Sequence, residues 1–315
     1  MISDLKNKHL NVRFFLKLLL TITISVFFII YALKDFNYSS FVDSIYNAKL
    51  FYIYLSIIIL LVTIQLRAMR WRFLFKKNVK VNDLYAAQLI GYMGNNLLPL
   101  RFGEFLKSYY LEKKIKISKF KVFGTVILER VLDLIGMLLL VLIIMNTNVY
   151  TKISSYYLNF IILIFFISLL AIVFSIYIKS TKNIKSSNKI VLIISDIIHG
   201  FSSLAYHNVL YVFIMTLLIW INYIIVVYLV QYAFSFNLDI YQSILLLLLP
   251  TLALSIPSLP GNIGTFEGAV VYTLSLYGIE DNIGFGFILH SISLIPYTLL
   301  GLIYFVKDRK IIFNE

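Results

Sequence analysis

A short, interrupted apolar stretch at residues 84–100 lies between two clusters of basic residues, and this arrangement restricts the fold of the chain severely. The clusters occupy residues 67–80 and 101–121. Lys and Arg residues that flank membrane segments stay on the cytoplasmic side. If both clusters are cytoplasmic, the stretch between them enters the membrane and turns back. Because non-helical backbone at membrane depth is stable only against protein or a water-filled cavity, this segment predicts a polar cavity inside a membrane protein.

The composition indicates an all-α integral membrane protein. Of the 315 residues, 60% are hydrophobic, and the mean hydropathy is +0.89. Several apolar runs reach the roughly 20 residues that a helix needs to span a bilayer. We predict six spans, at residues 14–33, 50–66, 122–145, 156–178, 209–231 and 285–306. No polar stretch is long enough for a second, soluble domain, so we expect one polytopic membrane domain over residues 1–315.

The basic residues lie almost entirely on one side of these spans. Of the 28 Lys and Arg residues, 24 fall in residues 1–17, 67–83, 101–121, 179–190 and 307–315. The opposite loops carry only Lys34, Lys49 and Lys152. This asymmetry predicts a cell-membrane protein with six crossings and both termini in the cytoplasm. The net charge of +13 then reflects topology and contact with anionic lipid, and no nucleic-acid partner is expected.

A second interrupted apolar segment covers residues 241–279. Given six crossings, it must enter and leave from the outer side, whereas the first one, near residues 84–110, enters from the cytoplasm. Interrupted apolar segments in the two halves of a chain point to a transporter site. Both breaks contain Leu-Pro followed by Gly and then Glu, a likeness that leaves an inverted repeat open. The residues expected to shape the breaks are Pro99, Pro257, Pro260, Gly261 and Gly264.

Residues near 190–206 carry apolar side chains at helical spacing, with polar side chains on the other face. Ile190, Ile194 and Ile197 belong to the apolar face, and Asp196 and His199 to the polar one. The pattern predicts an amphipathic helix in the cytoplasmic interface. A plain connector and a regulatory element are equally compatible with it.

Charged residues inside an apolar span are the main candidates for function. The span at 122–145 contains Glu129, Arg130 and Asp133. Glu129 and Asp133 are four positions apart and share a helix face. Because charges at depth cost a few kcal/mol or more each, they normally face a partner or a cavity. The cluster either joins helices through ion pairs or lines a polar path, in which Arg130 would bind an anion and the carboxylates would hold cations or position arginines.

Three polar residues surround the first break. Arg101 precedes a helix-compatible segment, whose N-terminus would attract a phosphate through its free N–H groups. Arg101 would serve equally as a topological anchor at the surface. Glu104 is expected to cap, to pair with a cation, or to touch a ligand. Asn96 either satisfies backbone groups that the turn frees or meets a lipid head group.

Arg67, Arg70 and Glu267 complete the set of candidate binding residues. Arg67 and Arg70 are three positions apart at the end of the second span and so share one face. They are either positive-inside anchors or recognise lipid phosphate. Glu267 is the single acid within residues 241–279, which favours a functional role.

The chain contains no Cys and four scattered His residues. Disulfides, Cys-ligated metals and iron–sulfur clusters are therefore excluded. The His residues show no metal-ligand spacing, so we expect no metal and no cofactor.

Four motifs in order resemble a known family. The chain is similar to the flippase-like membrane region of lysylphosphatidylglycerol synthases, the multiple peptide resistance factor family, in its stand-alone form. The matching motifs are Arg67-Ala-Met-Arg70-Trp71, Asn96-Leu-Leu-Pro99-Leu-Arg101-Phe-Gly103-Glu104, Glu129-Arg130-Val-Leu-Asp133, and Pro257-Ser-Leu-Pro260-Gly261-Asn-Ile-Gly264-Thr-Phe-Glu267-Gly268. The resemblance implies a lipid-translocating domain. It does not imply lipid synthesis, which in this family belongs to a soluble transferase domain that the chain does not show.

We therefore expect a membrane transporter that moves a phospholipid or lipid-linked phosphate between leaflets, not an enzyme. Its ligands would be membrane lipids with anionic or phosphate-bearing head groups. Arg101 and Arg130 would be the phosphate partners. Two alternatives stay open: an intramembrane lipid-modifying enzyme that uses Glu129 or Asp133 as acid or base, and a membrane scaffold for a synthase or glycosyltransferase. A homo-oligomer and a partner synthase are compatible with each of these three functions.

Overall fold

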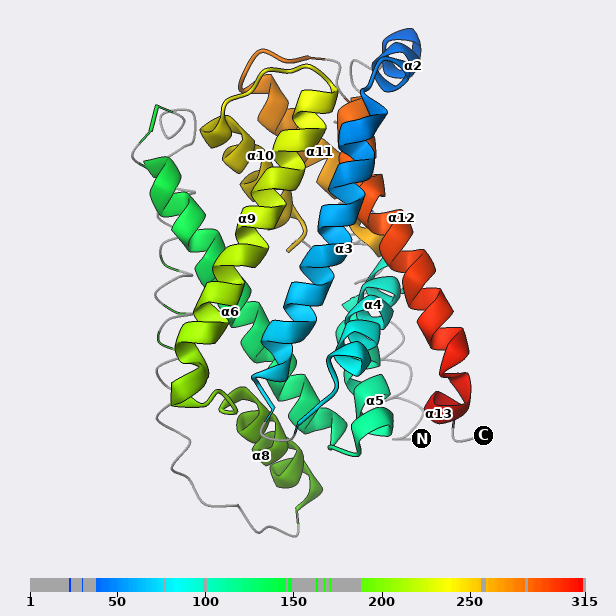
Figure 1. Ribbon diagram of the computed structural model, residues 1–315, viewed down its shortest axis with the longest axis vertical. Coiled ribbons are helices and arrows are strands. Elements are labelled where there is room, and N and C mark those ends of the chain that lie inside the picture. Colours follow the sequence, from blue (N-terminus) through cyan, green and yellow to red (C-terminus); the bar gives the residue numbers. More distant parts are fainter. Residues whose placement is uncertain are drawn as a thin grey trace, which may run out of the picture.

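The computed structural model describes residues 38–75, 78–98, 101–145, 147–148, 188–255, 259–280 and 283–313, together with a few single positions. Every regular element within these ranges is helical (Figure 1). The predicted spans at 14–33 and 156–178 fall almost wholly outside the described residues, as do Pro99 and Pro257.

Among the described residues, four long helices run along the length of the molecule (Figure 1). They are α3 (Leu50–Arg72), α6 (Lys119–Met145), α9 (Val209–Ala233) and α12 (Ile283–Lys307). Among the described residues, the segments Leu50–Arg72, Tyr206–Ala233 and Ile283–Lys307 are long and apolar enough to cross a membrane. The protein is an all-α membrane protein. α3 continues six residues beyond the predicted end at residue 66, and these residues include the buried Arg67 and Arg70.

Two shorter helical hairpins lie between the long helices. The first consists of α4 (Val81–Leu97) and α5 (Gly103–Ile115), and the second of α10 (Ile240–Ala253) and α11 (Thr265–Ser275). The first hairpin lies in the lower half of Figure 1 and the second in the upper half. The tip of the second contains the short helix η4 (Pro260–Asn262), which packs against α4. The two hairpin tips thus meet inside the molecule.

The backbone at both tips has the geometry of a tight turn. Gly261 and Gly264 have φ angles of 71° and 89°, values that glycine adopts without steric cost. Gly103 lets α4 and α5 approach closely, because an added Cβ would lie 1.9 Å from the carbonyl oxygen of Gly91. Arg101 adopts a positive φ of 55° immediately before this contact.

The remaining described elements lie at the two ends of the bundle. The helix α8 (Lys189–Phe201) packs against α6 at the lower end of Figure 1, where α13 (Arg309–Phe313) packs separately against α5 and α12. The helix α2 (Tyr38–Tyr46) lies at the upper end. The 3-10 helix η3 (Tyr206–Asn208) leads into α9. On α8, Ser195 is buried whereas Ile190 and Ile194 are exposed, and the placement of this helix in the membrane interface stays a prediction.

The interior of the lower half is built around Trp71. This side chain is fully buried together with Leu84, Leu111 and Leu128, which come from α4, α5 and α6. Because lipid tails are as apolar as these side chains, close packing and polar contacts hold membrane helices together more than the hydrophobic effect does. The polar contacts in this protein are concentrated next to Trp71.

Candidate functional site

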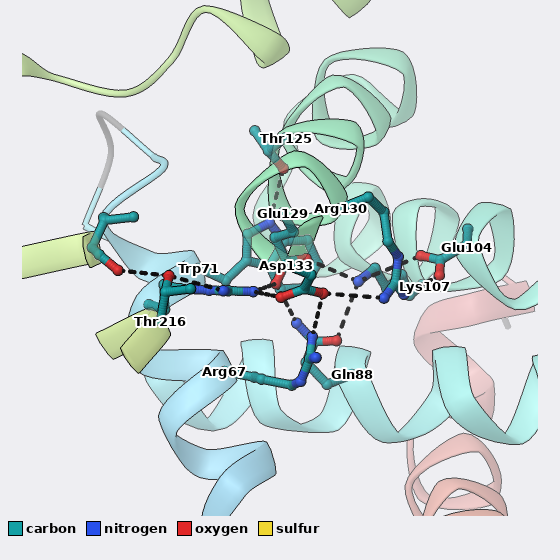
Figure 2. Close-up of polar contacts among 12 residues, drawn as sticks. Arg67, Trp71, Gln88, Glu104, Lys107, Thr125, Glu129, Arg130, Asp133 and Thr216 are labelled. Atoms are coloured by element: carbon teal, nitrogen blue, oxygen red, sulfur yellow. Dashed lines mark hydrogen bonds and ion pairs between the residues drawn. The ribbon is translucent and has the colours of Figure 1, made fainter. Parts of the chain in front are cut away.

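A buried network of ion pairs joins α3, α4, α5, α6 and α9 (Figure 2). It brings together six of the nine binding residues that the sequence suggested. These six are Arg67, Arg70, Glu104, Glu129, Arg130 and Asp133.

Asp133 holds the two arginines of α3. Arg67 Nη1 lies 2.9 Å from Oδ2 of Asp133, and Arg70 Nη2 lies 2.7 Å from Oδ1. The side chains are 7%, 0% and 14% exposed for Arg67, Arg70 and Asp133. Each carboxylate oxygen therefore accepts a charge-assisted hydrogen bond away from water, which is among the stronger polar contacts in proteins.

The structure places Arg67 and Arg70 inside the protein, 6% and 0% exposed. Their roles as positive-inside anchors or as ligands of a lipid phosphate stay predictions. On the far side they contact α9, where Arg70 donates to Thr216 at 3.1 Å and Arg67 donates to the hydroxyl of Tyr223 at 3.0 Å. The polar residues of α9 were not candidates because a lone Thr or Tyr in an apolar helix gives no distinctive signal.

Glu129 forms a second closed group with Lys107 and Gln88. Lys107 Nζ lies 2.9 Å from Oε2 of Glu129, and Gln88 Nε2 donates to Oε1 at 2.8 Å. Lys107 also donates to Gln88 Oε1 at 3.2 Å and lies over the Trp71 ring, 4.6 Å from its centroid. The sequence did not single out Lys107, because it stands among lysines that the charge asymmetry explains as cytoplasmic.

Arg130 lies at the open side of the network. It forms ion pairs with Glu104 and, at 3.4 Å, with Oδ2 of Asp133, yet its side chain is 43% exposed. Arg101 lies at the neighbouring hairpin tip, and it interacts electrostatically with both Arg130 and Glu104. Its guanidinium also reaches Oδ1 of Asn262 on the opposite tip, at 3.4 Å. Arg101 and the partly exposed Arg130 therefore both lie near Glu104 at the open side of the network.

The charges of the network do not cancel. Four cations, Arg67, Arg70, Lys107 and Arg130, face three carboxylates, and Arg101 adds a further positive charge at the open side. Inside the protein, Arg67, Arg70 and Lys107 outnumber Asp133 and Glu129 by one charge. At the open side, Arg101 and Arg130 outnumber Glu104 by one charge, so part of the excess positive charge lies where these two arginines are accessible.

Residues 17–301 of the chain match the family described as the lysylphosphatidylglycerol synthase transmembrane region. The chain belongs to this family. A UPF0104 membrane protein of Methanocaldococcus jannaschii is 26% identical over 225 residues, which cover 69% of this chain and 95% of the relative. A UPF0104 membrane protein of Methanothermobacter thermautotrophicus is 26% identical over 270 residues, with coverages of 76% and 80%. No solved structure gives a significant match.

The four motifs that indicated the lysylphosphatidylglycerol synthase family have defined places in this fold. The first ends α3, the second leads from the first tip into α5, the third lies within α6, and the fourth leads from the second tip into α11. The first three supply the charged side chains of the ionic network apart from Lys107, which follows the second motif. The fourth approaches it through the contact between Asn262 and Arg101.

Two further predicted binding residues of the family motifs, Asn96 and Glu267, make contacts outside the ionic network. Asn96 donates to Thr298 Oγ1 at 2.9 Å and to the carbonyl oxygen of Leu294 at 3.3 Å, and so ties the end of α4 to α12. Glu267 pairs with His290 and accepts a hydrogen bond from the backbone N–H of Gly264. Among the described residues, no group of three His, Asp or Glu side chains is placed to hold a metal ion.

Proposed function

We propose that this protein moves a phospholipid or a lipid-linked phosphate between membrane leaflets, and that Arg101 and Arg130 hold the phosphate. The observation that carries this proposal is the exposed pair of arginines at the meeting point of the hairpin tips. A planar guanidinium matches the geometry of phosphate oxygens and presents several donors at once. An excess of positive charge next to such a pair favours an anionic ligand.

The surroundings of the arginines favour an amphiphilic ligand over a free anion. Leu97, Leu98, Phe102 and Phe105 at the same tip are 41–54% exposed. The ring of Phe105 stacks on that of Phe123, with the ring centroids 4.5 Å apart. These apolar side chains could contact acyl chains while the adjacent arginines bind the head group. A soluble phosphate would gain nothing from them.

The depth of the tip supports movement across the bilayer. At about 1.5 Å per residue, the 17-residue helix α4 places Arg101 on the order of 25 Å from the basic end of the hairpin. The hydrocarbon core is about 30 Å thick. A head group bound at Arg101 would therefore have left its own leaflet surface.

Purified protein in liposomes with fluorescent lipids on one leaflet tests this function directly. We expect transfer of a phosphate-bearing lipid to be faster than that of a glycolipid without phosphate. Arg101→Ala should slow phospholipid transfer about ten- to a hundredfold, because a hydrogen bond to a charged group contributes about 1.5–3 kcal/mol. Arg72→Ala is the matched control, since Arg72 is exposed and hydrogen-bonded only locally, to Asn78.

The choice of Arg101 avoids confusing function with folding. Arg130→Ala would also remove partners from Glu104 and Asp133, whereas the hydrogen bond of Arg101 within the described residues is a long contact of 3.4 Å with Asn262. Equal transfer by the wild type and by a stable Arg101→Ala protein would reject the phosphate role. Mass spectrometry of the recovered lipids separates transport from the enzymatic alternative, because a lipid-modifying enzyme would change the lipid mass.

A further inference from the structure

A buried His–Glu pair lies in the second hairpin, apart from the ionic network. His290 Nδ1 is 2.6 Å from Oε1 of Glu267, and the two side chains are 10% and 11% exposed. The ring of Phe266 stacks on the imidazole, with centroids 4.5 Å apart. The second oxygen of Glu267 accepts the backbone N–H of Gly264 at 2.7 Å. The carboxylate therefore accepts hydrogen bonds both from the imidazole and from the backbone at the start of α11.

The helices around this pair supply few charges of their own. The helix α10 contains no Asp, Glu, Lys, Arg or His, and α11 contains only Glu267 of these types. On α12, His290 is joined by Lys307 in the last turn. The helix α9 carries none of these residue types. Tyr297, also on α12, donates its hydroxyl to the carbonyl oxygen of Leu60.

The charged groups on the other helices that pack against α12 are engaged elsewhere or lie toward the helix ends. They are Asp43 on α2, Arg67, Arg70 and Arg72 on α3, Asp83 on α4, and Arg309 and Lys310 on α13. The facing hairpin tip contributes Arg101, which reaches Asn262. The electrostatic partners of Glu267 are His290 and nearby backbone groups.

We propose that Glu267 and His290 form a proton-binding site that couples lipid movement to a proton gradient. Because an ionised carboxylate can only accept hydrogen bonds, Nδ1 of His290 carries the proton that faces Glu267. Uptake of one further proton at Nε2 converts the imidazole to imidazolium, and the net charge of the pair changes from −1 to 0. Histidine is the side chain whose charge changes most readily near neutral pH.

The pair is connected to the phosphate site through a short segment of backbone. Glu267 fixes Gly264, and Asn262, two residues earlier, contacts Arg101. An unprotonated pair leaves a net negative charge at the base of this tip, which favours the contact of the tip with Arg101. Protonation removes that charge and frees Arg101 for a lipid phosphate. This coupling rests on the proposed lipid movement, whereas proton binding by the pair does not.

The first experiment tests the proton site without lipid movement. The chain has no native Cys, so Ile263→Cys, at a side chain that is 49% exposed on the tip, accepts a single spin label. In nanodiscs, we expect the mobility of the label to differ between about pH 5.5 and about pH 8.5. His290→Gln should abolish that change, and His207→Gln, at an exposed histidine, should retain it. Mobility that is independent of pH, or unaffected by His290→Gln, would overturn the proposal.

The second experiment measures the coupling of lipid movement to a proton gradient. It uses proteoliposomes that contain a fluorescent anionic phospholipid and across whose membrane a pH gradient is imposed. For one proton per lipid, the steady-state lipid ratio between leaflets should shift by up to about tenfold per pH unit, since one unit corresponds to about 1.4 kcal/mol. His290→Gln should still equilibrate the lipid but lose this dependence. Lipid movement that ignores the gradient would overturn the coupling and leave the proposed function intact. A pH-dependent tip without any lipid movement would refute the proposed function and leave the proton site standing.

Discussion

At the scale of single residues, exposure divides the ionic network into two parts with different roles. Arg70 and Glu129 are almost completely buried, and their partners are other charged or polar side chains. Arg130 and Arg101 are the accessible members. Buried ion pairs rarely add net stability over apolar packing, but removing one partner is costly because it leaves an unpaired charge. The inner residues therefore fix the helices, and the outer arginines are available to a ligand.

The pair of Lys107 and Glu129 gives a direct test of this division. Lys107→Met should lower the free energy of unfolding by about 3–5 kcal/mol, because Glu129, only 1% exposed, would lose its nearer cation and keep only the longer contact of 4.0 Å with Arg70. Adding Glu129→Gln should restore part of the loss by removing the unpaired charge. Lys121→Met, at an exposed lysine, is the matched control and should have little effect. Thermal unfolding in detergent measures all four proteins, and equal stability of the two lysine variants would contradict the structural role.

At the scale of elements, each hairpin depends on how closely its two helices and the opposite tip approach one another. Gly94 and Gly103 lie in contact across the first hairpin, since a Cβ on Gly94 would lie 2.7 Å from the Cα of Gly103. Small residues that let backbones approach are characteristic of helix packing in membranes. This close approach places Glu104 and Lys107 of α5 against the charges of α6.

Gly103→Ala should therefore open the first hairpin. Its Cβ would lie 1.9 Å from the carbonyl oxygen of Gly91, a backbone atom that cannot move independently of α4. We expect a clear loss of thermal stability together with reduced lipid transfer. Gly286→Ala is the control, because its Cβ would make an ordinary contact of 3.4 Å with Val270, and alanine favours a helix by about 1 kcal/mol. If both variants were equally stable, close packing at Gly103 would not hold the hairpin.

The sequence predicted the two breaks and the charged cluster of α6, but not how the charges are shared. A Pro-Gly pair within an apolar segment and acidic residues within a predicted span can each be recognised from neighbouring residues alone. Lys107 and Gln88 join the network only because the first hairpin folds back on α6, and such pairing depends on tertiary contacts that no local pattern records. For the same reason, the sequence did not indicate that Glu267 would select His290, 23 positions later.

At the scale of the whole molecule, the arrangement of the hairpins makes a prediction about topology. Residues 73–75, 78–80 and 116–118 lie at the lower end of Figure 1, and residues 234–239 lie at the upper end. At about 1.5 Å per residue, α5, with 13 residues, is on the order of 20 Å long. This length is shorter than the hydrocarbon core of about 30 Å. The first hairpin should therefore enter and leave the membrane on one side.

Single cysteines can test this topology because the chain has none of its own. Asn78→Cys and Lys116→Cys, at exposed positions on the two sides of the first hairpin, should react with a membrane-impermeant thiol reagent only from the cytoplasmic side. Asn237→Cys, exposed before the second hairpin, should react only from outside. This is the orientation that places the basic residues inside. Reaction of Asn78→Cys and Lys116→Cys from opposite sides would mean that the first hairpin crosses the membrane, and its tip could not then meet the second from the opposing face.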